Sequence, residues 1–180
     1  VNTLGVEHLV RACRQTECSL IHISTDYVFD GSNPEGYTPA DKTNPINVYG
    51  RTKREGEERI EQGLERYFIV RTSWLYSRKY PPNFYLTILS KAQKGEDLTV
   101  TDSQKGCPTD AANLARHILD LIQEGSTRYG ISHFTDGEAM TWYGFASRIL
   151  EEHGLEDRID LRRGDNYVTF AARPEYSILR

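Results

Sequence analysis

The sequence predicts an α/β fold in which helices cover a mostly parallel sheet. Three observations lead to this prediction. Short apolar, β-branched segments alternate with amphipathic segments of roughly a dozen residues. The segment 19–24 (SLIHIS) is typical of a strand buried in a parallel sheet. The 180 residues are 38% hydrophobic and 27% charged, which is the composition of a globular chain and not of a disordered one.

The first part of the chain is predicted to contain helices, strands and one long loop. A helix over residues 3–14 places its apolar side chains on one face. The loop over residues 31–47 is rich in Gly, Pro, Asn and Asp, and loops of this length are usually functional or disordered. A charged helix over residues 48–62 follows and ends at Gly63. Strands are predicted at 19–24 and 67–76.

The second part of the chain continues the alternation. A helix over residues 82–94 ends at Gly95. Either Thr109 or Asp110 caps a helix that extends to about Glu124, and Thr141 opens a last helix to about His153. Short strands are predicted at 98–102, 129–135 and 159–161, and the C-terminal end is irregular.

Charge and cysteine content exclude several classes of protein. The net charge is −4, which argues against a nucleic-acid polymer as partner but not against a site for one small anion. No segment approaches the ~20 apolar residues of a membrane span, and a signal peptide is not evident. Three irregularly spaced cysteines indicate reduced thiols, so we expect a cytoplasmic protein without a membrane partner. The five histidines show no metal-ligand spacing, and no metal ligands are predicted.

A Tyr and a Lys stand four residues apart at the start of the charged helix. Tyr49 and Lys53 therefore share one helical face. An ammonium beside a phenol lowers its pKa from about 10, which suits the Tyr to proton transfer. This spacing also occurs by chance, and a Lys on a charged helix is usually solvated, so the pair alone leaves both interpretations open.

Polar side chains follow two of the predicted strands. Ser24 and Thr25 end the first strand, and ligands bind beyond the carboxyl ends of parallel strands. These hydroxyls either bond a substrate oxygen or cap the backbone. Trp74 follows Arg71 at the end of the second strand and either packs in the core or lines a pocket.

The motifs taken together resemble the extended short-chain dehydrogenases/reductases, and within them the dTDP-4-dehydrorhamnose reductase family. The resemblance covers essentially the whole chain. It is carried by 24–31 (STDYVFDG), 47–53 (NVYGRTK), 71–76 (RTSWLY), 106–110 (GCPTD) and 172–179 (ARPEYSIL).

This resemblance implies a Rossmann-like doubly wound parallel sheet with a smaller α+β substrate-binding region. Residues 1–76 and 109–135 would form the remainder of the NAD(P)-binding domain. Residues 77–108 and 136–180 would bind the nucleotide sugar. The implied activity is NAD(P)H-dependent reduction of the C4 keto group of dTDP-4-dehydro-L-rhamnose to dTDP-L-rhamnose. A dTDP-linked 4-keto sugar is the implied partner, and a homodimer is compatible with the family.

The resemblance also assigns site residues by motif position. Thr25, Tyr49 and Lys53 would be catalytic, with Tyr49 protonating the keto oxygen and Thr25 bonding it. Tyr49, Lys53 and Thr72 would hold NADPH or NADH. The substrate would meet Thr25 and a further set: Asp26, Tyr27 and Trp74 at the sugar, Gln104, Pro108 and Thr109 at the nucleotide, and Arg173 at the diphosphate. Asn2 matches an Asn that orders a relay water.

The chain departs from the family at its beginning. A strand, a GxxGxxG turn and a helix are expected there, and Gly5 has no glycine partner at that spacing. We therefore expect a part of a longer reductase, and weak or no NADPH binding by these 180 residues alone in a calorimetric titration. A magnesium site of some members cannot be placed on this sequence.

Two other interpretations stay open. The regulatory β subunit of methionine adenosyltransferase resembles the same subfamily and acts as a binding partner. It lacks the RTSW motif, so residues 71–76 favour the enzyme. Alternatively, the chain is an inactive fragment of the reductase.

Overall fold

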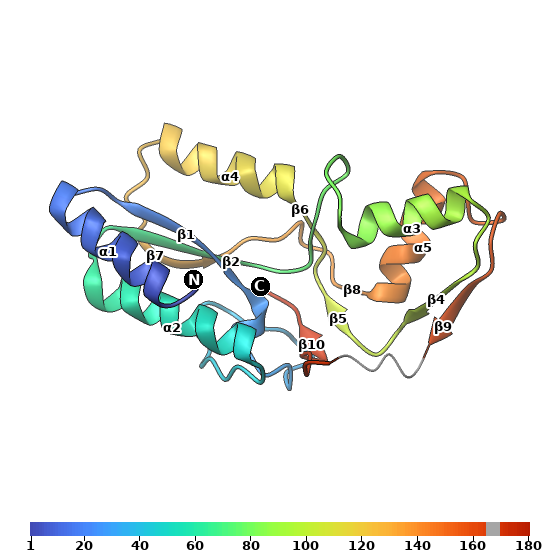
Figure 1. Ribbon diagram of the computed structural model, residues 1–180, viewed down its shortest axis with the longest axis horizontal. Coiled ribbons are helices and arrows are strands. Elements are labelled where there is room, and N and C mark those ends of the chain that lie inside the picture. The colour runs from blue at the N-terminus through green and yellow to red at the C-terminus, as the bar shows by residue number, and fades with distance from the viewer. Residues whose placement is uncertain (165–169) are drawn as a thin grey trace.

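Three parallel strands form the centre of the first part of the molecule. The computed structural model describes residues 1–164 and 170–180. The strands β1 (Leu20–Thr25), β2 (Tyr67–Thr72) and β7 (Gly130–His133) pair in the order β1-β2-β7. Helices α1 (Leu4–Thr16) and α2 (Val48–Gly63) pack together on one side, and α4 (Ala111–Gln123) lies on the other (Figure 1). This arrangement confirms the predicted α/β class with a parallel sheet.

Apolar side chains from both helices of one face meet the central strand. Val6 and Val10 of α1 and Ile60 of α2 pack with Ile69 of β2, and all four are buried. The sequence predicted the helix, but the prediction that its apolar side chains share one face is wrong for Leu4 and Leu9, which are exposed. The cluster fixes α2 on the sheet, so that the start of α2 lies at the carboxyl ends of the strands.

A second core forms in the other part of the molecule. Helices α3 (Phe84–Gln93) and α5 (Trp142–Glu152) pack against β4 (Leu98–Thr101), which pairs in parallel with β9 (Leu161–Gly164). Phe145 and Ile149 of α5 are central to this core, which also buries Tyr85 and Ile88 of α3. The core shares no member with the cluster at the three-stranded sheet.

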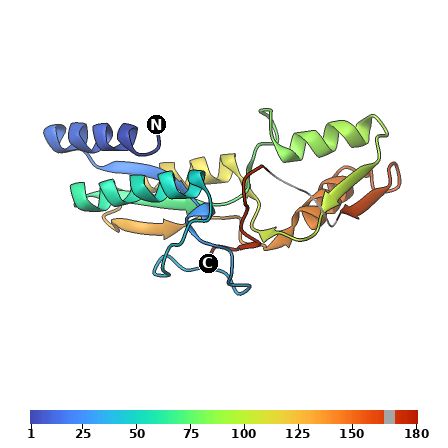
Figure 2. The same ribbon diagram turned by 60° about the horizontal axis from the view of Figure 1, so that its bottom comes forward.

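Very short strands connect the two parts. Two-residue strands form the sheet β10-β5-β8 and the pair β3-β6. Their bounds are β3 (Leu75–Tyr76), β5 (Lys105–Gly106), β6 (Thr109–Asp110), β8 (Met140–Thr141) and β10 (Tyr176–Ser177). The long loop meets the C-terminal segment below the main sheet (Figure 2), where Tyr37 bridges Leu179. A single turn of 3-10 helix, η1 (Asp26–Val28), follows β1 directly.

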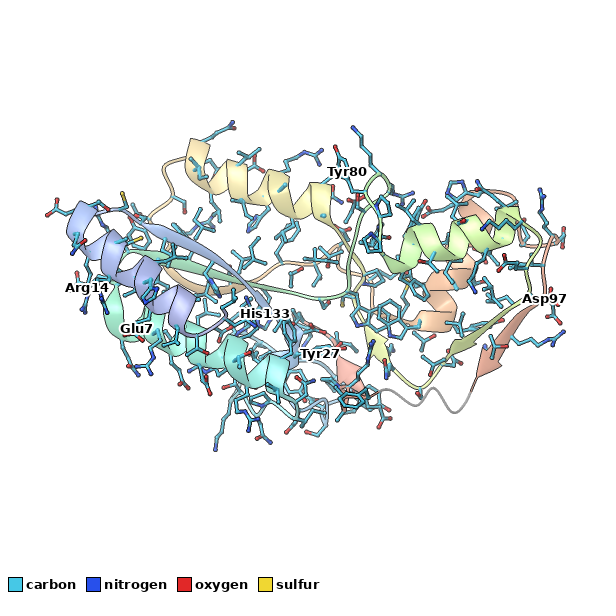
Figure 3. All side chains as sticks on the ribbon, in the orientation of Figure 1. Glu7, Arg14, Tyr27, Tyr80, Asp97 and His133 are labelled. Carbon is cyan, nitrogen blue, oxygen red and sulfur yellow. The ribbon has the colours of Figure 1, made fainter. Side chains whose placement is uncertain are left out.

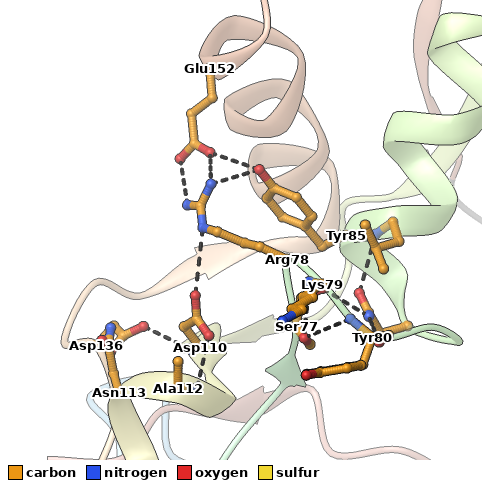
Figure 4. A network of polar contacts seen from close by, with 12 residues as sticks. Ser77, Arg78, Lys79, Tyr80, Tyr85, Asp110, Ala112, Asn113, Asp136 and Glu152 are labelled. Carbon is orange, nitrogen blue, oxygen red and sulfur yellow. Dashed lines mark hydrogen bonds and ion pairs between the residues drawn. The ribbon is translucent and has the colours of Figure 1, made fainter. Parts of the chain in front are cut away.

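An ion-pair network also joins the two parts. Arg78, after β3, contacts Glu152 of α5 at 2.8 Å and Asp110 at 3.5 Å (Figure 4). Asp110 caps α4 by accepting from the Ala112 N–H at 2.9 Å. The network therefore links the start of α4 to the end of α5. The sequence left open whether Thr109 or Asp110 caps this helix, and the structure shows that Asp110 does.

Two predicted strands differ from the structure. The single strand over 67–76 is divided into β2 and β3, because Trp74 adopts a left-handed backbone with φ 47° that cannot continue a strand. The strand predicted over 159–161 lies at 161–164 instead, because Ile159 turns into the second core. The first strand begins and ends one residue later than predicted. No helix in the described residues is both long and apolar enough to span a bilayer.

Candidate active site

The carboxyl ends of β1 and β2 meet the first turn of α2. Thr25 and Thr72 are register partners at the last position of each strand. Asn47 caps α2 by accepting from the Gly50 N–H at 2.8 Å. At position 50 a Cβ would lie 2.0 Å from the Tyr27 carbonyl oxygen, so Gly is needed for this close approach. The approach brings Tyr49 beside η1, where its ring meets the Tyr27 ring edge-on at 5.8 Å.

A cleft of about 360 Å³ opens at this edge of the sheet. Most of the predicted site residues line it, although they come from four separate segments of the sequence. Figure 3 marks Tyr27 near the junction of the two parts, where the cleft lies. The predicted residues in the lining are Thr25, Asp26, Tyr27, Tyr49, Lys53, Thr72, Trp74 and Arg173.

Tyr49 is half-exposed at the cleft and carries its proton at neutral pH. Burial raises the pKa of Tyr49 above its usual 10, while a hydrogen bond with Thr25 acts in the opposite direction. The phenol is therefore a proton donor in this structure. The sequence predicted a lowered pKa, and the difference arises because Lys53 is directed elsewhere.

Lys53 lies one turn after Tyr49 and points toward β1. Its ammonium donates to the Ile23 carbonyl at 2.6 Å and lies 3.3 Å from His22 Nε2. Burial lowers the pKa of His22 to about 4, so the imidazole is neutral and accepts from the ammonium. Burial also lowers the pKa of Lys53. His22 could not be predicted as a site residue, because its place in an apolar strand gave no functional signal.

Thr25 and Asp26 form a buried hydrogen-bonded pair. The Thr25 hydroxyl donates to Asp26 Oδ1 at 2.9 Å and accepts from the Tyr27 N–H at 3.2 Å. Burial raises the pKa of Asp26 to about 6, although the hydroxyls of Ser177 and Thr25 favour its ionised form. A carboxyl group with this pKa changes its charge near neutral pH.

A buried ion pair lies behind the cleft and fixes α2 to β2. Arg71 Nε and Nη2 donate to the two oxygens of Glu57 at 3.0 and 2.8 Å, and both side chains are almost fully buried. Arg54 contacts the same carboxylate at 3.0 Å. These contacts keep the pKa of Glu57 below its usual value even though burial opposes this. The sequence showed Glu57 only as one charge of a charged helix.

Two tryptophans stack at the wall of the cleft. The rings of Trp74 and Trp142 are 3.6 Å apart and nearly parallel. Trp142 Nε1 donates to the Gln104 side-chain oxygen at 3.0 Å. Trp74 therefore lines a pocket, as the family resemblance implied. Trp142 also lines it, although the sequence did not indicate this residue.

A second, more apolar groove of about 420 Å³ adjoins the cleft. Trp142 and Arg173 line both spaces, so the two share a boundary. The groove also contains Gln104 and Lys91. At the cleft, burial raises the pKa of Tyr27, whereas the charge of Arg173 and its hydrogen bond lower it.

Pro108, Thr109 and Asn2 lie away from both spaces. Thr109 is fully buried, and its hydroxyl donates to the Cys107 carbonyl at 3.2 Å. Pro108 lines a different cavity, together with Arg78. The Asn2 amide donates to the Thr52 hydroxyl at 3.2 Å. Within residues 1–164 and 170–180, no group of three or more His, Cys, Asp or Glu side chains could hold a metal ion.

Comparisons with known proteins agree on one family. The model of the RmlD substrate binding domain matches residues 1–180. The spore coat polysaccharide biosynthesis protein SpsK of Bacillus subtilis (strain 168) is 35% identical over 99% of this chain and 62% of its own length. The dTDP-4-dehydrorhamnose reductase of Sinorhizobium fredii (strain NBRC 101917 / NGR234) is 35% identical over 99% of this chain and 63% of its own.

A solved structure gives the same result. The dTDP-4-dehydrorhamnose reductase (rfbD) of Bacillus anthracis str. Ames, in complex with NADP, superposes with a TM-score of 0.94 at 35% identity. The match covers 100% of this chain and 63% of that one. The chain therefore spans less than two thirds of the length of the proteins it matches.

Proposed function

The chain belongs to the RmlD substrate binding domain family, and from this we propose that it carries the reaction site of a nucleotide-sugar reductase. The proposed reaction is NAD(P)H-dependent reduction of the C4 keto group of dTDP-4-dehydro-L-rhamnose to dTDP-L-rhamnose. The name of the Sinorhizobium fredii relative, dTDP-4-dehydrorhamnose reductase, supports this substrate. The observation that carries the proposal is the convergence of Thr25, Tyr49 and Lys53 in one cleft.

Residues of the cleft fit a reduced nicotinamide cofactor. Two N–H bonds of the Lys53 ammonium are directed at β1, which leaves a third for a ribose hydroxyl. Among the described residues, the buried Thr72 hydroxyl has no hydrogen-bond partner, so it can bond a ligand. When bound, the cofactor would supply the hydride. Both NADPH and NADH fit this proposal, and the NADP complex of a relative supports the former.

Proton transfer to the substrate is the task of Tyr49. Its raised pKa keeps the phenol protonated, and its half-exposed position lets the hydroxyl meet a substrate oxygen in the cleft. Thr25 lines the same cleft, and its hydroxyl would stabilise the charge that develops on the oxygen. Asp26, Tyr27 and Trp74 line the space left for the sugar.

We assign the nucleotide to the groove beside the cleft. Gln104 and Trp142 offer a hydrogen-bonding amide and an aromatic face. Arg173 stands where cleft and groove meet, so its charge suits a diphosphate that joins a sugar to a nucleoside. Pro108 and Thr109 are left out of these contacts, because Thr109 is fully buried and Pro108 lines a different cavity.

The two separate cores support our assignment of the cofactor and the nucleotide sugar to different parts of the chain. Residues 1–76 and 109–135 contain the three-stranded sheet and would serve the cofactor. Residues 77–108 and 136–180 contain the core around α3 and α5 and would hold the nucleotide sugar. A cytoplasmic location is part of the proposal and is supported by three free cysteines.

Replacing Tyr49 by Phe tests the proposed function. The substitution removes the phenol proton while the ring remains, so turnover of dTDP-4-dehydrorhamnose with NADPH should fall by roughly 10²-fold to 10⁴-fold. Binding of the dTDP-sugar, measured by calorimetry, should change little, because the proton is needed only in the chemical step. Tyr80→Phe is the matched control, since Tyr80 is exposed and outside the cleft lining. Near-normal turnover by Tyr49→Phe would overturn the proposal.

A further inference from the structure

Two of the three cysteines lie at the C-terminal end of α1, away from the cleft. Cys13 is partly buried in the last turn of the helix, and Cys18 is exposed just beyond it. Both line a pocket of about 380 Å³ beside the ends of α1 and α2. This pocket shares no lining residue with the cleft, so the two thiols take no part in the proposed reduction.

The backbone at this helix end determines how the two cysteines are placed. Glu17 adopts a left-handed conformation with φ 55°, and the Cys18 N–H donates to the Cys13 carbonyl at 3.1 Å. These two features define a Schellman motif, in which the side chains at the positions of Cys13 and Cys18 contact each other. Apolar side chains commonly make this contact, whereas here both positions carry a thiol. The motif therefore brings two sulfur atoms to the same side of the turn.

Contacts with neighbouring segments hold the turn in this conformation. Arg14 Nε donates to the last carbonyl of α2 at 2.7 Å, and Arg66 donates to the Glu17 carbonyl. The Cys18 thiol donates to the Thr16 carbonyl at 3.7 Å, so this side chain points back toward the helix. The two cysteines are therefore kept together by an ordered backbone and not by chance encounters in a loop.

We propose that Cys13 and Cys18 form a redox site that closes to a disulfide bond when it meets a low-molecular-weight disulfide. A disulfide spans about 4.4–6.8 Å between Cα atoms, and a side-chain contact across a Schellman motif meets this requirement. Because a backbone hydrogen bond already joins the two residues, the bond can form without unfolding the end of α1.

The oxidation proceeds by two thiol–disulfide exchanges. Cys18, the exposed thiol, loses its proton and attacks one sulfur of the small disulfide, which leaves a mixed disulfide and releases a small thiol. Cys13 then loses its proton and attacks the Cys18 sulfur, which forms the internal bond and releases the second small thiol. The two protein thiols lose two electrons to the small disulfide, and the two leaving thiolates take up the two protons. An excess of the small thiol reverses both steps.

Mass spectrometry of the 180-residue chain treated with glutathione disulfide tests the proposal. The intact mass should fall by two hydrogen atoms, and the free thiols should fall from three to one, because Cys107 is buried and stays reduced. Trypsin cleaves after Arg14, between the two cysteines. The digest should therefore contain residues 12–14 joined to residues 15–42, and reduction should separate them.

Cys13→Ser is the control, because it removes the thiol that completes the reaction. This variant should stop at the mixed disulfide, so its mass should rise by one glutathione unit. In the wild-type chain the mixed disulfide should be at least about tenfold less abundant, since the second exchange is intramolecular. A wild-type chain that retains the mixed disulfide as the variant does, or that crosslinks to a second copy, would overturn the inference.

Thermal unfolding shows whether the bond suits the folded chain. The oxidised wild-type chain should keep the Tm of the reduced chain or exceed it, because the bond joins residues that the native turn already holds together. A Tm that falls on oxidation means that the turn must distort to form the bond, and this result refutes the proposed site.

Discussion

Substituting alanine for Gly50 tests whether the close approach of α2 to η1 builds the site. The added Cβ would lie 2.0 Å from the Tyr27 carbonyl oxygen and 3.0 Å from Pro45 Cβ. Carbon–oxygen contacts need about 3.3 Å. Because the oxygen belongs to the backbone, no side-chain rotation relieves the clash, and the two segments must separate by about 1 Å.

The cost follows from two opposing effects. Overpacking of this kind costs about 1–3 kcal/mol, while alanine in a helix gains up to about 1 kcal/mol over glycine. The net loss should therefore be about 1–2 kcal/mol, which lowers the Tm by roughly 2–8 °C for a chain of this size. Tyr49 moves with α2, and a displacement of about 1 Å should slow the proposed reduction by up to ~10²-fold.

Unfolding by urea and by heat, followed by circular dichroism, measures the effect. Gly5→Ala is the matched control, because Gly5 lies in α1 and nothing stands within 4 Å of its added Cβ. That control should be neutral or more stable than the wild-type protein by up to about 1 kcal/mol. If Gly50→Ala is as stable as Gly5→Ala, the close approach does not position α2 and the reasoning fails.

Four further predictions concern three carboxyl groups and the stacked tryptophans. Glu57→Ala leaves Arg71 buried without its partner and should cost about 3–5 kcal/mol in urea unfolding, more than any exposed carboxylate. The pKa of Asp26 is raised from 3.8 to about 6 on folding, so stability should fall by roughly 3 kcal/mol as pH rises from about 3 to about 7, and Asp26→Asn should flatten this slope. Hydrogen bonds lower the pKa of Asp30 in the folded state, so its contribution has the opposite sign: it is present at neutral pH, is lost toward acid pH, and is absent from Asp30→Asn. Trp142→Phe removes one of the two tryptophans, so the near-ultraviolet circular dichroism of the stacked pair should collapse, and dTDP affinity should drop by about tenfold.

Local patterns were sufficient to predict the main helices and the sheet. The helices at residues 3–14 and 48–62 form as predicted, because burial of apolar side chains such as Val10 and Ile60 stabilises a helix in a protein. The strands at 20–25 and 67–72 also follow from composition, although only β2 is buried along most of its length and β1 is buried only at Ser24 and Thr25. The short strands β5, β6, β8 and β10 carry no such signal, since two residues have no measurable period and pair only through tertiary contacts.

Site residues that stand in sequence motifs could be predicted, whereas those outside motifs could not. Thr25, Tyr49 and Trp74 lie in recognisable motifs and line the cleft together. His22 and Trp142 line or support the site through contacts that span 31 and more residues, and neither stands in a motif. Such residues become visible only when the fold brings distant segments together.

Trp74 explains why the break between β2 and β3 could not be predicted from the sequence. The segment is rich in strand-forming residues, yet Trp74 takes a left-handed conformation that costs on the order of 1–3 kcal/mol. Several contacts hold it there: its carbonyl accepts from the Thr109 N–H at 3.3 Å, its ring stacks on Trp142, and Gly106 leaves room for the indole, which would lie 2.5 Å from a Cβ at that position. Each partner comes from a distant segment, so no local pattern could predict the break. The backbone strain is therefore sustained by the same contacts that direct the indole into the cleft, which makes Gly106 and Thr109 supports of the site although neither lines it.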